Sequence, residues 1–143
     1  MIKGGINHIT LTVRSLKKAK KFYQDILGLK LVGQRQGMDF YSSGLYNHEL
    51  ALIEDKNMSI KIAVNGGFAH VAFNVENKHS LKQLQQKLIN SNISVSTGVN
   101  HTIAYSFYTR DFDGYMIEFT TDNEKDSWNN NSHDFQYDTT YSL

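Results

Sequence analysis

Two histidines and one glutamate are placed in the sequence where they are suited to bind a metal ion. His8 lies in "NHITLTV", His70 lies 62 residues later in the similar "AHVAFNV", and Glu118 lies in "YMIEF". Because strand side chains alternate between faces, all three fall on the face opposite their apolar neighbours. Two imidazoles and one carboxylate on one side of a metal are typical of non-heme Fe(II) sites that activate oxygen. Mn(II), Zn(II) and Ni(II) accept the same donors.

The elements that position these residues follow the same 62-residue repeat. Each histidine-headed strand leads into a helix; Ser15 is the expected N-cap of the first, and Gly28 occupies its left-handed C-cap position. Asn90, at the position equivalent to Gly28, is the expected cap of the second helix. Strand-like segments follow each helix, at 30–34, 38–42 and 48–54 in the first half and at 93–96, 106–110 and 115–120 in the second. Each half therefore predicts a β-α-β-β-β module.

Both helices carry an apolar stripe that predicts their buried face. The stripe residues are Ala19, Phe22, Tyr23, Ile26 and Leu27 in the first helix and Leu81, Leu84, Leu88 and Ile89 in the second. A module of about 60 residues is marginally stable alone, so the two are expected to pair around a shared cavity. The prediction is an α+β fold with one domain, 1–123, made of modules at about 4–62 and 66–122. A polar, partly ordered tail is expected at 124–143.

Composition excludes several classes of function. The chain has 15 basic and 14 acidic residues, so it lacks the broad positive field that nucleic acid or an anionic membrane surface requires. It has no cysteine, which excludes disulfides, thiolate metal sites and a cysteine nucleophile. No signal-peptide-like or membrane-spanning apolar run is present. A cytoplasmic protein with a small-molecule substrate is the expectation.

These features resemble the vicinal oxygen chelate superfamily, which includes glyoxalase I, fosfomycin-resistance proteins, bleomycin-binding proteins and extradiol dioxygenases. The similar segments are "INHITLTV", "LKKAKKFYQDILGLKLV", "GFAHVAFNV" and "SFYTRDFDGYMIEF". The resemblance implies a half-barrel of two pseudo-symmetric modules around a metal held by His8, His70 and Glu118, and a homodimer as one oligomeric state. Phe112 is a departure, because the family turn usually reads Asp-Pro-Asp-Gly; the expected effect is on turn rigidity rather than chemistry.

Three segments favour the catechol-type extradiol dioxygenases within this superfamily. "NHELALIE" is similar to their His-Xaa-Leu-Ala segment and implies that His48 acts as an acid/base. "NHTIAYSFY" matches their pattern of a histidine followed seven residues later by a tyrosine, here His101 and Tyr108. "EFTTDNEKDSW" is similar to the end of single-domain bacterial members. The function implied is Fe(II)-dependent ring cleavage of a catecholic substrate with dioxygen. Histidine bases suit this chemistry because their reference pKa is about 6.5.

Three other functions stay open at this point. A fosfomycin-type thiol transferase uses the same ligands but needs cations around a phosphonate, and residues 96–106 contain no Lys or Arg. A glyoxalase I-like enzyme needs a fourth carboxylate, for which Glu54 is the candidate because "IE" recurs at 53–54 and 117–118. A metal-free binding protein is the least favoured, since such proteins lose the ligand residues.

Overall fold

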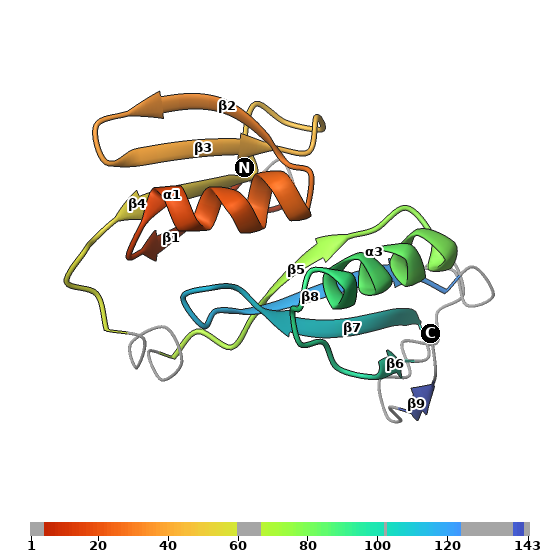
Figure 1. Ribbon diagram of the computed structural model, residues 1–143. Coiled ribbons are helices and arrows are strands. Elements are labelled where there is room, and N and C mark those ends of the chain that lie inside the picture. The colour runs from red at the N-terminus through yellow and green to blue at the C-terminus, as the bar shows by residue number, and fades with distance from the viewer. Residues whose placement is uncertain (1–4, 60–66, 102, 124–138, 142–143) are drawn as a thin grey trace. The chain divides into compact units, whose positions relative to one another are not determined.

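The computed structural model describes residues 5–59, 67–101, 103–123 and 139–141 (Figure 1). The chain divides into two compact units, Met1–Gly66 and Gly67–Leu143. This division lies close to the boundary that the repeat predicts between the modules, and the pairing of the two into one domain stays a prediction. Among the described residues, no helix is long and apolar enough to cross a membrane.

The first unit contains a four-stranded mixed sheet. Its strands are β1 (Ile9–Val13), β2 (Lys30–Arg35), β3 (Met38–Ser42) and β4 (Leu50–Glu54), in the order β1-β4-β3-β2. The β1 and β4 strands are parallel, whereas β2-β3 and β3-β4 are antiparallel. Alternation places the fully or almost fully buried side chains on one face of the sheet: Leu11, Val13, Leu50 and Leu52.

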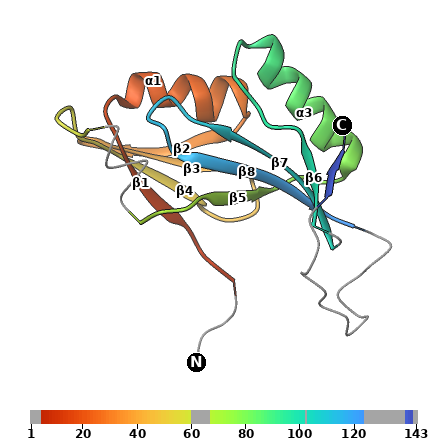
Figure 2. The same ribbon diagram turned by 90° about the horizontal axis from the view of Figure 1, so that it is seen from below.

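A helix covers this apolar face (Figure 2). It begins after Ser15, whose side-chain oxygen accepts a hydrogen bond from the Lys18 amide at 3.4 Å, as the sequence predicts. The first part, α1 (Leu16–Lys20), is α-helical, and η1 (Lys21–Ile26) widens into a π-helix, which the sequence pattern did not predict. The helix ends before Gly28, which has the expected positive φ of 85°.

The second unit repeats this plan with one additional strand. Its elements are β5 (Val71–Asn74), α3 (Lys78–Asn90), β6 (Gly98–Asn100), β7 (Ala104–Arg110), β8 (Met116–Asp122) and β9 (Thr139–Tyr141). The sheet order is β5-β8-β7-β6-β9, with β5 and β8 parallel and the other pairs antiparallel. The α+β class and the βαβββ order of each module are therefore confirmed.

The core of the second unit lies between α3 and the sheet. Phe107, Ile117 and Phe119 are at most 3% exposed, and they belong to the strands that α3 contacts. Leu81 and Leu88 of α3 are fully buried, as the predicted stripe requires. Ile89 is 46% exposed, so its assignment to the buried stripe was wrong.

The end of α3 differs from the prediction. Asn90 is the last helical residue, and the left-handed residue is Asn92, with a φ of 58°. The Asn92 amide donates to the Ile89 carbonyl at 2.9 Å, and the Ile93 amide donates to the Leu88 carbonyl at 3.0 Å. These two bonds form a Schellman motif, which places the cap two residues beyond the repeat-equivalent position.

A strand predicted at 93–96 is also wrong. Val95 forms only an isolated bridge to Thr109, and the strand that pairs with β7 is β6. The physical reason is local, because the Tyr108 amide donates to the Ser96 hydroxyl at 2.9 Å instead of to a backbone carbonyl. A side-chain acceptor of this kind replaces the regular ladder hydrogen bond.

The turn between β7 and β8 is confirmed. The Asp111 carboxylate accepts from the Asp113 and Tyr115 amides at 3.0 and 2.9 Å, and Gly114 has a φ of 93°. The predicted tail lies mostly outside the described residues, but its end forms β9, which the sequence did not predict. This strand pairs with β6, where Gly98 lies opposite Tyr141.

Candidate metal centre

Three neighbouring strands of the second unit position His70, Glu118 and Tyr108 on one face. His70 directly precedes β5 and lies two residues before Ala72, so the two share a face. Ala72 is the register partner of Glu118 on β8. Across the other ladder of β8, Tyr108 of β7 is the partner of Glu118. Since Ile117 and Phe119 are buried on the α3 side, Glu118 points to the opposite face.

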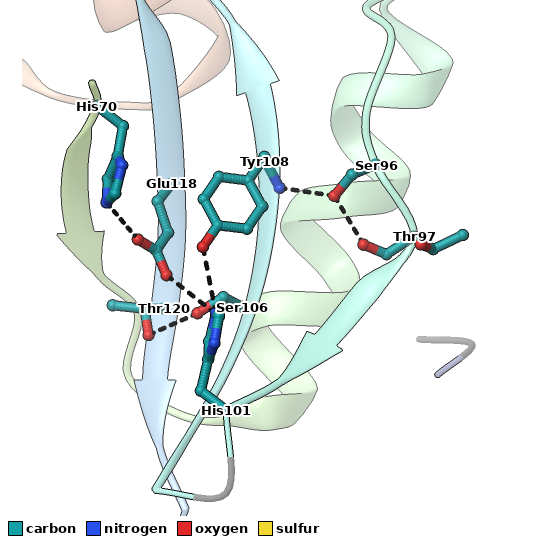
Figure 3. Close-up of polar contacts among 8 residues, drawn as sticks. All are labelled: His70, Ser96, Thr97, His101, Ser106, Tyr108, Glu118 and Thr120. Carbon is teal, nitrogen blue, oxygen red and sulfur yellow. Dashed lines mark hydrogen bonds and ion pairs between the residues drawn. The ribbon is translucent and has the colours of Figure 1, made fainter. Parts of the chain in front are cut away.

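The Glu118 carboxylate lies between two imidazoles (Figure 3). Its Oε2 is 2.9 Å from His70 Nε2, and its Oε1 is 3.7 Å from His101 Nε2. The Glu118 side chain is only 11% exposed, whereas the His70 side chain is 40% exposed. A buried carboxylate is stable only with charged or hydrogen-bonding partners, and these imidazoles supply them.

His101 and Tyr108 extend this cluster. The Tyr108 hydroxyl is 3.2 Å from His101 Nε2, which is within hydrogen-bonding distance. Its ring also contacts His70 edge-on, with ring centroids 5.9 Å apart. The separation of seven residues in the sequence therefore corresponds to a direct side-chain contact, and the second unit brings together four of the predicted site residues.

Backbone contacts hold the residues that carry these side chains. The His101 amide donates to the Ala104 carbonyl at 2.8 Å, which closes the connection between β6 and β7. Tyr108 is held by Ser96 in both directions. Its amide donates to the Ser96 hydroxyl (Figure 3), and its carbonyl accepts from the Ser96 amide at 2.8 Å. Side chains supported in this way keep the geometry of a site.

Sequence reasoning missed the hydroxyl pair of Ser106 and Thr120 on the same sheet face. Ser106 is fully buried, and its hydroxyl donates to that of Thr120 at 2.9 Å. Both residues are two positions from a site residue on the same strand, Ser106 from Tyr108 and Thr120 from Glu118. The alternation of strand faces was the signal for this pair.

The first unit brings His8 and His48 together. Their ring centroids are 4.6 Å apart, and the Phe40 ring contacts His48 edge-on at 5.3 Å. His8 Nδ1 is 2.8 Å from the Asn7 amide oxygen. An amide oxygen only accepts, so an Nδ1–H that donates to it leaves the lone pair of the ring on Nε2, which is the form that a metal ligand needs.

Glu54 lies in a different environment. Its Oε1 accepts from the Leu16 amide at 3.1 Å, at the start of α1, and its Oε2 is 4.0 Å from Lys56 Nζ. The structural equivalent of Glu118 in the first unit is Ala51. In the first unit Thr10 is the register partner of Ala51, and in the second unit Ala72, which the 62-residue repeat makes equivalent to Thr10, is the register partner of Glu118. The equivalence that the repeated Ile-Glu pairs predicted was therefore wrong, and a ligand role for Glu54 stays a prediction.

The donor chemistry of the second unit fits a divalent metal. His70 and Glu118 present a nitrogen and an oxygen within 2.9 Å of each other, and imidazole and carboxylate are ligands of Fe, Mn, Ni and Zn. Within the described part of the chain, no three His, Asp or Glu side chains already form a metal-binding group. Participation of His8 stays a prediction, because it belongs to the other unit.

Comparison with known proteins identifies the superfamily to which the sequence is similar. Residues 5–119 match the family model of the glyoxalase/bleomycin resistance protein/dioxygenase superfamily. Metallothiol transferase FosB of Staphylococcus haemolyticus is 30% identical over 128 residues, covering 88% of each chain. Biphenyl-2,3-diol 1,2-dioxygenase 3 of Rhodococcus globerulus is 28% identical over 118 residues, covering 81% of this chain and 62% of that protein.

A solved structure shares the fold. The crystal structure of an integron cassette protein from the Halifax Harbour sewage outfall metagenome superposes with a TM-score of 0.70. The two sequences are 27% identical, and the match covers 84% of this chain and 99% of the other.

Proposed function

We propose that this chain, which belongs to the glyoxalase/bleomycin resistance protein/dioxygenase superfamily, is an extradiol-type ring-cleaving dioxygenase acting on a catecholic substrate. One observation carries the proposal: the hydrogen-bonded pair of His101 and Tyr108 lies against the Glu118 carboxylate. Ring cleavage of a diol needs a base and a hydrogen-bond donor beside the metal ligands, and this pair supplies both.

His70 and Glu118 would hold the metal, together with His8 from the first unit. Fe(II) is the metal proposed, and it would supply a shared binding position for the diol and dioxygen. The 11% exposure of the Glu118 side chain favours this role, because a metal compensates the cost of burying its charge.

His101 is the proposed base that takes a proton from a substrate hydroxyl. Its Nε2 faces both Glu118 and the Tyr108 hydroxyl, so a substrate oxygen near Tyr108 also lies near this nitrogen. The Tyr108 O–H then donates a hydrogen bond to the deprotonated oxygen. His48 is proposed as the acid/base of the first unit, where its ring lies against the His8 ring at a tilt of 38°.

Metal-dependent thiol transfer is the second candidate. It is favoured by the relative named metallothiol transferase, which matches over 88% of both chains, whereas the dioxygenase relative is covered to only 62%. It is disfavoured because a transferase acting on an anionic phosphonate needs several cations at the site, whereas residues 96–106 contain no Lys or Arg. A glyoxalase-like isomerase is less favoured, because the Glu54 carboxylate is bound at the start of α1.

The test is to purify the protein without oxygen, load it with Fe(II) and add catechol in air while recording oxygen uptake. Dioxygenase activity predicts oxygen consumption and a yellow ring-opened product, and His101→Gln should abolish both. His79→Gln is the matched control, because His79 is an exposed residue in the first turn of α3. Absence of oxygen uptake, together with formation of a thiol adduct from fosfomycin and cysteine, would refute the proposal in favour of the second candidate.

A further inference from the structure

A cavity of about 460 Å³ lies next to Tyr108 in the second unit. Its walls include Ile93 and Val95 from the connection after α3, Arg110 from β7, Phe112 from the turn and Met116 from β8. Tyr108 is also a wall residue, so the cavity and the candidate metal centre share a residue. A volume of this size is within the range of small-molecule pockets.

The register of β7 and β8 places two wall residues of the cavity next to the centre. Arg110 and Met116 are register partners, and the next pair on the same face is Tyr108 and Glu118. Two residues along a strand span about 7 Å. A substituent that extends about this far from a diol bound near Glu118 therefore reaches the Arg110 and Met116 level.

The cavity walls combine apolar surface with one cation. Phe112 is 42% exposed and stands where the similar family turn usually has proline, so this chain places an aromatic ring at the rim. The Arg110 Nη1 donates to the Gly114 carbonyl at 2.7 Å, which orients the guanidinium and leaves further N–H donors on the same group. Among the described residues that line the cavity, none is Asp or Glu.

We propose that this cavity binds an anionic, apolar side chain of the substrate, with Arg110 pairing its carboxylate. This inference rests on the proposed function for the diol end and adds the substrate class: a catechol carrying a short apolar chain or ring that ends in a carboxylate. The guanidinium determines specificity because a planar fork of donors matches a carboxylate. Phe112 and Met116 contribute the apolar contact.

The test measures binding without turnover. Fe(II)-loaded protein is titrated under anaerobic conditions with two probes, a catechol bearing a propanoate chain and the same catechol bearing the uncharged propanamide. Arg110→Gln should raise the Kd of the propanoate roughly tenfold and leave that of the propanamide nearly unchanged. Lys82→Gln on α3 is the matched control, since it removes one exposed positive charge outside the cavity.

A second variant is needed because Arg110→Gln also removes the hydrogen bond to the Gly114 carbonyl in the turn between β7 and β8. Ser94→Glu places a carboxylate in the cavity wall without altering Arg110, and it should weaken the propanoate but not the propanamide. Equal effects of both variants on the two probes, or no effect on either, would overturn the subsite. Selective loss of propanoate binding by the variants, with no ring cleavage when the wild-type protein is afterwards given the propanoate catechol in air, would support the subsite and refute the dioxygenase, so the two proposals fail separately.

Discussion

Tyr108→Phe removes one hydroxyl from the candidate centre and keeps the aromatic ring. The ring contacts with His70 and His101, at centroid distances of 5.9 and 6.4 Å, do not depend on the hydroxyl. The backbone also remains bound to Ser96. The stability loss should therefore be that of one partly buried hydrogen bond, about 0.5–1.5 kcal/mol.

The effect on catalysis should be larger than the effect on stability. If the hydroxyl donates to the deprotonated substrate oxygen, its loss removes a charge-assisted hydrogen bond, which corresponds to a kcat about 10 to 100 times lower. The assay is oxygen uptake by Fe(II)-loaded protein over a range of catechol concentrations, with metal content measured on the same samples. KM should change less than kcat, because the interaction strengthens as charge develops on the oxygen.

Tyr105→Phe is the matched control for this variant. Tyr105 belongs to the same strand but faces the other side, where its ring contacts Tyr141 and Lys78. It should keep wild-type kcat. Equal kcat for wild type, Tyr108→Phe and Tyr105→Phe, at equal metal content, would refute the catalytic role of Tyr108.

Three further predictions concern the scaffold. Gly98→Ala places a Cβ 2.9 Å from the Tyr141 ring and carbonyl, so it should displace β9 and destabilise the second unit by about 1–3 kcal/mol. Hydrogen exchange of the Thr139–Tyr141 amides measures this effect. Gly33→Ala is the control and should be neutral, because its Cβ would make an ordinary 3.6 Å contact with Phe40. Glu54→Gln should lower the free energy of unfolding, measured by thermal unfolding, by about 0.5 kcal/mol and leave the metal content unchanged. Loss of metal from this variant would instead support a ligand role for Glu54. Burial, and then the neighbouring Tyr105, raise the pKa of Tyr141 to about 12. As the pH rises, the Tyr141 hydroxyl therefore loses its proton in the unfolded chain before it does so in the folded chain. The contribution of Tyr141 to the free energy of unfolding should be complete below about pH 10 and should fall between about pH 10 and 12. Denaturant unfolding of Tyr141→Phe should show a shallower decrease over that range, and parallel curves for the two proteins would contradict the assignment.

The strand patterns were sufficient to predict most of the fold. Alternation identified 38–42 as a strand with the bounds of β3, and it placed Glu118 on the face opposite Ile117 and Phe119 before any register was known. Ser15 and Gly28 predicted the ends of the first helix because capping depends on local residue type.

The errors occurred where side chains or distant segments decide the structure. The bridge at Val95 does not become a strand because the Ser96 side chain takes the Tyr108 amide. The second helix ends at a Schellman motif whose position depends on the Leu88 and Ile89 carbonyls rather than on the repeat. The β9 strand depends on pairing with β6, a long-range contact that three residues of local pattern do not reveal.

The candidate centre was predicted as residue types but not as contacts. The sequence motif suggested His101 and Tyr108 together, and the 3.2 Å contact explains their spacing. The repeat suggested Glu54 as the counterpart of Glu118, which failed because a repeated dipeptide does not define strand register. Register is set by the whole ladder, so Ala51 takes the equivalent position.

Product analysis under isotopically labelled dioxygen tests the central claim most directly. The Fe(II)-loaded protein is mixed with catechol under heavy-oxygen gas, and the product mass is measured. The account predicts a ring-opened product that contains both atoms of the labelled dioxygen, and no such product with Glu118→Gln. Unchanged catechol from fully iron-loaded protein, or a product without the label, would contradict it.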